Sequence, residues 1–321
     1  MRTTRSFRVR PADVGIVGVL DGGTLLEWVH SVAHELAMGW SGRHCVTASF
    51  GNFHLDRPIV AGDVVDISAD LVYTGTSSIH ILVTVCTQPA TARQAPQMAQ
   101  CSIVFVAIDH SDASVEVRQW TPVTMLELQR HRQARVRIRT RKQFESVSAE
   151  CLTAGTTAAK FSLRLFAAPA DHAWGGRVHG GRVMRWMDDA ACACAADWVG
   201  ARVVTSYIAG IRFCRPVFAG DDIELTARVI HTGPRSVHLE VRVTAHASNG
   251  AGTRLVAHGV IVVVWIDDRG AARRVRQWEA HTDEDHRLDQ YARHLVEFRQ
   301  FVEPFTTTPA LVADAQVAPV A

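Results

Sequence analysis

The feature of this sequence best suited to chemistry is a carboxylate inside an apolar helical segment. Asp188 and Asp189 follow the pair Gly180-Gly181 within one short stretch. The seven residues from Gly181 to Asp188 would span nearly two helical turns, about 10 Å of axis, so both residues lie on one face. Helical side chains lean toward the N-terminus, which aims the Asp188 carboxylate at the N–H groups of the first turn.

This arrangement suits attack on a carbonyl group. The first-turn N–H groups and the positive end of the helix dipole can receive an oxyanion. Asp188 can act as a general base on water or attack the carbonyl itself, and both routes remain open. Glycine at 180 and 181 lets a substrate approach the backbone closely. The structural alternative is an acid that only interacts with the helix dipole, but Asp188 lies beyond the range where that effect is large. We expect Asp189 to be the solvated or hydrogen-bonded member of the pair.

The sequence contains two copies of one domain, 158 positions apart. Roughly a third of the paired positions between 11 and 120 are identical without a gap, which indicates duplication. A period this long is typical of duplicated domains, not of a solenoid of short repeats. Matching segments are Pro11-Ala12-Asp13 with Pro169-Ala170-Asp171, Gly22-Gly23 with Gly180-Gly181, Thr74-Gly75 with Thr232-Gly233, and Arg118-Gln119-Trp120 with Arg276-Gln277-Trp278.

Each copy has the same expected order of elements. An apolar stretch follows the Gly-Gly pair and predicts a buried helix, over 24–38 in the first copy and 182–198 in the second. Runs rich in Val and Ile, separated by turn segments, then predict antiparallel strands. The fold class is therefore α+β, with a long central helix and a curved sheet in each copy. The strands expected in the second copy are 202–213, 222–231, 236–245 and 255–266.

The segments outside the two copies have their own composition. We expect domain 1 at 1–123, a charged and solvated connector, partly helical, at 124–152, and domain 2 at 153–278. Apolar residues near helical spacing predict a C-terminal helix at 279–303, followed by a disordered tail at 304–321. The connector is rich in arginine, but aromatic residues that could stack on bases are not interleaved with it. We therefore expect no nucleic-acid partner.

The composition is that of an ordinary globular protein. The 321 residues suffice for two domains, and 47% hydrophobic residues with a formal net charge of +2 exclude disordered and fibrous classes. The seven cysteines are scattered and form no Cys-x-x-Cys pair, which favours a reducing, cytoplasmic compartment. The longest apolar run, residues 260–266, falls short of the roughly 20 residues of a membrane helix, so no membrane span is predicted.

Several motifs together resemble the ACOT-type hotdog acyl-CoA thioesterases. The resemblance covers both copies up to Trp278, and the duplicated arrangement looks like the vertebrate-type cytosolic acyl-CoA hydrolases. It implies two tandem hotdog domains that hydrolyse acyl-CoA to free acid and CoA. It also implies no metal, no organic cofactor and a homo-oligomer of three chains. The motifs are Pro-Ala-Asp at 169–171, Gly-x-x-His-Gly-Gly-x-x-Met-x-Trp-Met-Asp-Asp-Ala at 176–190, Val-Val-Thr at 203–205, Ile-x-Phe-x-Arg-Pro-Val-x-x-Gly-Asp at 211–221 and Thr-Gly-x-x-Ser at 232–236.

In the family that this chain resembles, the site is composite. The helix Asp comes from one hotdog, and an Asn seven residues before the first Gly comes from the other. Asp188 matches the Asp, whereas the Asn position holds Gly15 in the first copy and Ala173 in the second. The resemblance therefore implies one family-like site, formed by Asp188 and the loop 13–21, without the amide that would position water or substrate.

The first copy departs further from the family pattern. His30 occupies the position of the helix Asp, and Asp21 replaces His179. His30 could be a substitute base in a second site near the loop 172–179, which ends at His179, or a core histidine whose hydrogen bonds are satisfied. Two alternatives to a thioesterase stay open: a non-catalytic acyl-CoA or acyl-carrier binding protein, and a hotdog enoyl-CoA hydratase or dehydratase.

Two turns resemble the family loops near the CoA nucleotide. They contain Ser77 and Ser78 in the first copy and Arg235 and Ser236 in the second. Hydroxyls, backbone N–H groups and a guanidinium suit phosphate recognition. The alternative is a pair of ordinary hairpin turns.

Overall fold

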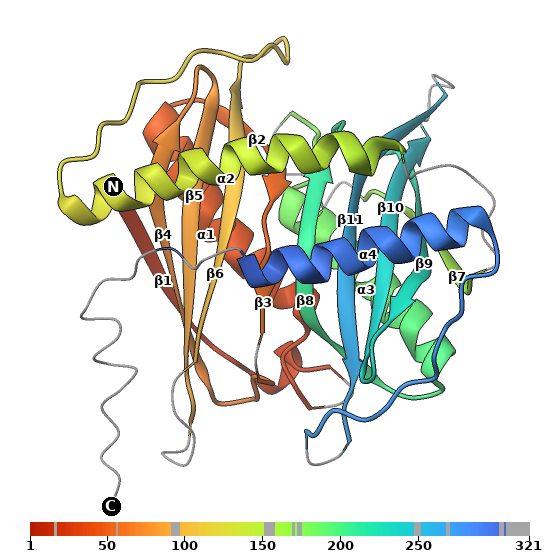
Figure 1. The fold of residues 1–321 in the computed structure, drawn as a ribbon. Helices are drawn as coiled ribbons and strands as arrows, with labels where there is room; N and C mark the ends of the chain where they lie inside the picture. Colours follow the sequence, from red (N-terminus) through yellow and green to blue (C-terminus); the bar gives the residue numbers. More distant parts are fainter. Residues whose placement is uncertain are drawn as a thin grey trace, which may run out of the picture. The chain divides into compact units, whose positions relative to one another are not determined.

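The computed structural model describes residues 1–15, 18–55, 57–90, 97–150, 158–168, 171, 175–246, 252–267, 270–301 and 305 (Figure 1). The chain divides into two compact units. Unit 1 comprises Met1–Phe50, His54–Gln143 and Glu303–Ala321, and unit 2 comprises Gly51–Phe53 and Phe144–Val302. Each unit is a helix packed on an antiparallel sheet, so the α+β prediction is confirmed in both.

Unit 1 is built on α1 (Gly22–Ser41), which begins after the N-cap Asp21 and ends at Gly42 in the left-handed conformation. A short 3-10 turn, η1 (Pro11–Asp13), precedes it. Five antiparallel strands follow the order β1-β4-β5-β6-β2. Their bounds are β1 (Arg2–Arg8), β2 (His44–Phe50), β4 (Val64–Thr74), β5 (Ser78–Gln88) and β6 (Gln97–Ile108). The two-residue β3 (Phe53–His54) follows β2, with Phe53 in unit 2 and His54 in unit 1.

Unit 2 repeats this plan around α3 (Gly180–Val199), which also ends at a left-handed glycine, Gly200. Its five strands follow the order β7-β9-β10-β11-β8 and are antiparallel throughout. The four strands predicted for this copy are confirmed to within two residues at each end. The bounds are β7 (Lys160–Phe166), β8 (Val203–Phe213), β9 (Asp222–Thr232), β10 (Ser236–His246) and β11 (Thr253–Trp265).

The predicted duplication is confirmed residue by residue. Adding 158 to the bounds of β1, α1, β4 and β5 gives the bounds of β7, α3, β9 and β10. Even the irregularity between Leu71 and Tyr73 recurs between Val229 and His231 in the repeated strand.

The core of each unit lies between its central helix and one face of its sheet. Period-two burial along β4 and β9 sends alternate apolar side chains toward the helix. On α3 these side chains meet small ones, which lets the strands approach the helix closely. The small buried residues of α3 are Gly181, Ala190, Ala191, Cys194 and Ala195.

A second helix covers the opposite face of each sheet. These helices are α2 (Met125–Glu150) and α4 (Asp283–Phe301), drawn in yellow-green and blue in Figure 1. Each begins with a capping box, in which Thr124 pairs with Glu127 and Thr282 pairs with Asp285. Within the described part of the chain, no helix is both long and apolar enough to cross a bilayer.

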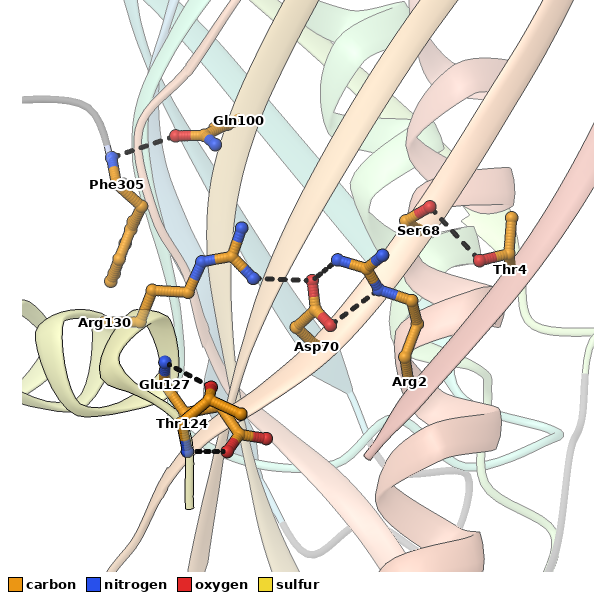
Figure 2. A network of polar contacts seen from close by, with 9 residues as sticks. All are labelled: Arg2, Thr4, Ser68, Asp70, Gln100, Thr124, Glu127, Arg130 and Phe305. Carbon is orange, nitrogen blue, oxygen red and sulfur yellow. Dashed lines mark hydrogen bonds and ion pairs between the residues drawn. The ribbon is translucent and has the colours of Figure 1, made fainter. Parts of the chain in front are cut away.

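The expectation of a solvated helix in the arginine-rich connector is wrong for one face of α2. Arg130 is only 4% exposed, because its guanidinium donates to the Asp70 carboxylate on β4 at 3.0 Å. Figure 2 shows Arg2 of β1 meeting the same carboxylate from the other side. Ala134, one turn after Arg130, packs on Leu82 of β5.

The ion pair between α4 and its sheet has the opposite arrangement to that of α2: the cation lies on the strand and the anion lies on the helix. Arg228 of β9, which matches Asp70 in the repeat, donates to Glu240 of β10 at 2.5 Å. The Nη2 atom of Arg228 lies 3.8 Å from the carboxylate of Glu284 on α4. Apolar contacts of Leu288 and Ala292 with Ile230 and Val260 complete this packing.

Phe305 belongs to unit 1, although α4, which ends four residues earlier, belongs to unit 2. Its ring is 2% exposed, packs with Leu82 and Ala134, and lies 3.8 Å from the Arg137 guanidinium. Burial lowers the pKa of Arg137 to about 10. The backbone N–H of Phe305 donates to Gln100 at 2.9 Å (Figure 2). The rest of the predicted disordered tail lies outside the described residues.

Candidate active site

The carboxylate of Asp188 is buried on α3 and hydrogen-bonded to the neighbouring strand. Its side chain is 2% exposed, and the Thr205 hydroxyl on β8 donates to its Oδ1 at 2.5 Å. Asp189 is exposed, as predicted. Burial among apolar groups disfavours a charged carboxylate, whereas a hydrogen bond donated to it favours the charge. Thr205 therefore offsets part of the desolvation that α3 imposes on Asp188.

The contact of Thr205 with Asp188 was not predicted, although Thr205 belongs to one of the motifs noted in the sequence. A signal was present, because the helix position and the threonine are 17 residues apart in both copies, at 30 and 47 and at 188 and 205. Chain geometry brings them together: α3 ends at Gly200, and β8 then runs back along the helix.

The first turn of α3 differs from that of α1 in a way that suits ligand binding. In α1, Asp21 accepts a hydrogen bond from the backbone N–H of Thr24 at 2.8 Å and so caps the helix. At the matching N-cap position of α3, His179 makes no side-chain capping bond. Gly181, in the first turn, is buried and Gly180 is half-buried. Backbone N–H groups at an uncapped helix start can bind an oxyanion.

A second polar contact fixes this helix start. Arg182 donates from Nε to Asp171 at 2.9 Å, and the backbone carbonyl of Asp171 accepts a hydrogen bond from His179. The carbonyl of His179 in turn accepts from the N–H of Arg182 at 2.9 Å. These bonds hold the Gly-Gly turn to the loop before it.

A thiol also contacts the threonine. The Sγ atom of Cys192, one turn beyond Asp188 on α3, lies 3.6 Å from the Thr205 hydroxyl oxygen. Cys194 is oriented differently and contacts the carbonyl of Ala227 on β9. Burial raises the pKa of Cys194 to about 11, so this thiol stays protonated.

Unit 1 contains the same geometry with different chemistry. His30 is 1% exposed, and its Nε2 lies 2.6 Å from the Thr47 hydroxyl oxygen. The ring stacks on His34 and meets the edge of Phe105. The structure thus gives Nε2 of His30 a partner on β2, and the role of His30 as a base in a second site stays a prediction.

The remaining predicted residues occupy other parts of the two units. Gly15 donates its N–H to the carbonyl of Val19 at 2.8 Å in unit 1. Ala173, His172 and the middle of the loop 172–179 lie outside the described residues. The loop 13–21 belongs to unit 1 and Asp188 to unit 2.

The two turns predicted to bind CoA are closed by local hydrogen bonds. Ser78 lies 3.1 Å from His80, and Ser236 lies 3.3 Å from His238, each through its hydroxyl. The backbone carbonyl of Ser77 accepts a hydrogen bond from Ala107. Arg235 is exposed. The exposed guanidinium can reach an anion, whereas the two hydroxyls already contact protein groups.

Comparison with known families gives two matches, one in each unit. The model of the Thioesterase superfamily matches residues 17–92 and 175–249. Its two segments begin 158 residues apart, the same separation that relates α1 to α3.

Individual proteins similar to this chain are also named as thioesterases or thioester hydrolases. Acyl-coenzyme A thioesterase 11 of Mus musculus is 27% identical over 74% of this chain, which spans only 42% of that protein's length. The cytosolic acyl coenzyme A thioester hydrolase of the same species is 22% identical, and the match covers 86% of this chain and 77% of that protein's length. An uncharacterized acyl-CoA thioester hydrolase of Zymomonas mobilis is 35% identical, over 33% of this chain and 72% of its own.

A solved structure shares the fold over most of the chain. The acyl-ACP thioesterase from Bacteroides thetaiotaomicron has a TM-score of 0.52 and 11% identity, and the match covers 82% of this chain and 97% of that one. At this level of identity the match speaks for the fold alone.

Proposed function

Because this chain belongs to the thioesterase superfamily, we propose that it hydrolyses acyl-CoA to a free carboxylic acid and CoA, with Asp188 as the working carboxylate. The single observation that carries this proposal is the burial of Asp188 beside Thr205, on a helix whose start has no side-chain cap. A carboxylate held out of bulk water in this way can act on a bound water or on the carbonyl itself.

In the proposed reaction, the thioester carbonyl lies against the first turn of α3. The N–H groups there bind the oxyanion that forms when the carbonyl is attacked. Asp188 removes a proton from the attacking water, or attacks directly to form an anhydride that water then opens. The thiolate of CoA leaves, and the Thr205 hydroxyl holds the carboxylate in place throughout.

The decisive experiment measures thiol release from a panel of acyl-CoA esters. We expect Asp188→Asn, which keeps the shape of the side chain, to lower kcat/KM at least about a hundredfold. Asp189→Asn is the matched control, because Asp189 is adjacent but exposed, and it should stay within about twofold of the parent. Full activity in Asp188→Asn would remove this carboxylate from the reaction.

The two roles of Asp188 can be separated by a single turnover in water enriched in oxygen-18. Direct attack gives an unlabelled first molecule of product, and puts the label into Asp188, when water opens the anhydride at the carboxyl carbon of Asp188; this result identifies direct attack, whereas opening at the acyl carbon labels the product. General-base catalysis places labelled oxygen in the product from the first turnover.

A second candidate function is acyl-CoA binding without turnover. The residues at the family Asn position favour it, because Gly15 and Ala173 carry no amide side chain. Calorimetry would support it if acyl-CoA bound tightly to the wild-type chain while no ester on the panel was hydrolysed.

The setting of this activity is also a proposal. We place the protein in the cytosol, in lipid metabolism, because one relative that matches over 86% of this chain is a cytosolic hydrolase. We expect the exposed guanidinium of Arg235 to bind a phosphate of CoA. By the resemblance described above we expect three chains to associate, which sedimentation can test.

A further inference from the structure

We propose that Cys192 is a positioning residue for this site, whose thiol donates a hydrogen bond to Thr205 and so directs the Thr205 hydroxyl proton onto Asp188. The inference deepens the proposed function and rests on it. Cys192 would not contact the reacting atoms. It would act through the threonine.

The Thr205 hydroxyl has too few protons to donate to both of its neighbours. A threonine hydroxyl has one proton to donate and can accept two hydrogen bonds. The short contact of 2.5 Å between Thr205 and Asp188 Oδ1 is that of a hydroxyl donating to a carboxylate, the stronger of the two bonds. The single proton therefore points at Asp188. At the other contact, 3.6 Å from Cys192 Sγ, the sulfur must be the donor.

The charge state of the thiol agrees with this direction. A thiolate has no proton to give, and a second negative charge one turn from a buried carboxylate would be repelled. Cys192 is half-buried and lies four residues after Asp188 on the same helix. The neutral thiol is therefore the form that fits, and it completes a chain from Cys192 to Thr205 to Asp188.

Unit 1 provides an internal comparison. The position that matches Cys192 is His34, whose Nε2 donates instead to the carbonyl of Cys45 at 3.0 Å. The thiol donor thus occurs in unit 2, which carries Asp188. In unit 1, which carries His30 instead, the matching His34 donates to a backbone carbonyl.

A donor behind the hydroxyl should strengthen the bond to Asp188. Hydrogen bonds in a chain polarise one another, by perhaps 10–30% per bond. A stronger bond stabilises the charged carboxylate, so that Asp188 remains ionised and able to act at lower pH. Loss of the thiol should therefore move the acid limb of the pH–rate profile to higher pH.

The first test compares Cys192→Ala with Cys192→Ser by the pH dependence of kcat/KM. Alanine removes the donor, and we expect the acid limb to move up by about half a pH unit, with about threefold lower activity below it and little change on the plateau. Serine keeps a donor, and its limb should coincide with that of the wild type. If both variants lose stability or activity without any movement of the limb, Cys192 only fills space and the inference is wrong.

The second test does not require activity. Alkylation of Cys192 by iodoacetamide, followed by mass spectrometry as a function of pH, reports its protonation in the wild type and in Thr205→Val. A thiol that donates to Thr205 is stabilised in its protonated form, so we expect the variant to be alkylated at lower pH. The exposed Cys214 is the reference within the same sample and should not change.

The two tests separate this inference from the function it rests on. A wild-type chain that hydrolyses no acyl-CoA, yet shows the expected change in alkylation, would overturn the proposed function and retain the hydrogen-bond chain. An active wild type whose Cys192 reacts identically with and without the Thr205 hydroxyl would overturn the inference and retain the function.

Discussion

At the scale of single residues, the chain twice places a threonine hydroxyl against a buried titratable side chain of a central helix. Thr205 contacts Asp188, and Thr47 contacts His30. The same backbone geometry thus supports an acid in unit 2 and a histidine in unit 1. This pairing supplies a matched test of the threonine.

We expect Thr205→Val to lower kcat/KM by about ten- to a hundredfold, because it removes a hydrogen bond to a buried carboxylate and leaves the desolvation unopposed. The acid limb of the pH–rate profile should also rise, since burial favours the neutral acid. Thr47→Val makes the same change in unit 1 and should leave hydrolysis within about twofold. Equal losses in both variants would show that the threonines act only through folding.

His34 should make the stability of the protein depend on pH. Burial lowers the pKa of this ring, although the carbonyl of Cys45 favours its protonated form. As the pH falls below the ordinary value of about 6.5, the unfolded chain binds a proton that the folded chain does not, so the free energy of unfolding decreases. The loss continues until the pH reaches the lowered folded-state pKa.

Urea denaturation at several pH values between 5 and 8 tests this expectation. In His34→Gln, which keeps an N–H donor and does not titrate, the decrease on acidification should be smaller. It should not vanish, because burial and the neighbouring Arg135 also lower the pKa of His131. An unchanged slope would mean that His34 has the same pKa in the folded and in the unfolded chain.

At the scale of elements, the outer helices are held by buried ion pairs whose removal should be costly. Arg228→Met leaves Glu240 without its guanidinium partner and takes the nearby cation away from Glu284. Loss of one partner of such a buried pair costs about 3–5 kcal/mol. The double variant Arg228→Met with Glu240→Leu should recover most of this loss, because unit 1 already has Leu82 at the matching position. Chemical denaturation of the single and double variants decides between recovery and a further loss.

The elements differ in how far the sequence foretells them. The helix over 24–38 and the strand over 222–231 were predictable, because long apolar or β-branched runs bury one continuous face. The strands β1 and β7 were missed, since they are short and mostly exposed: every second residue of β7 is half-buried, and only Thr3 and Phe7 are in β1. The buried face of α2 was hidden as well, because Arg130 finds Asp70 sixty residues earlier in the chain.

The candidate site divides in the same way. Asp188 could be recognised because a carboxylate in an apolar helix is conspicuous within a few residues of sequence. Its contacts with Thr205 and Cys192 depend on how β8 lies along α3, which no local pattern encodes. A candidate residue within one element can thus be predicted from the sequence, whereas contacts between residues of two elements become visible only in the fold.

At the scale of the whole molecule, Phe305, which follows α4, contributes to the first unit. Phe305→Ala should destabilise unit 1 by about 3–5 kcal/mol, because it leaves a cavity beside Leu82 and Ala134. Phe305→Leu keeps much of the apolar volume and should cost clearly less. Hydrogen exchange locates the effect: amides of β4 and β5 should exchange faster, and those of β9 and β10 should not. Equal acceleration in all four strands would contradict this assignment to unit 1.

The reversed charges under α2 and α4 bear on how a duplicated chain avoids exchanging parts while it folds. Because the two units have similar sheets, each outer helix could pack on the sheet of the other unit, here called the decoy. Such mispairing is a characteristic failure in the folding of repeated domains. On the decoy, Arg130 would face Arg228, and Glu284 would face Asp70. On its own sheet each helix instead meets a charge of opposite sign, which favours the correct pairing of two similar folds in one chain.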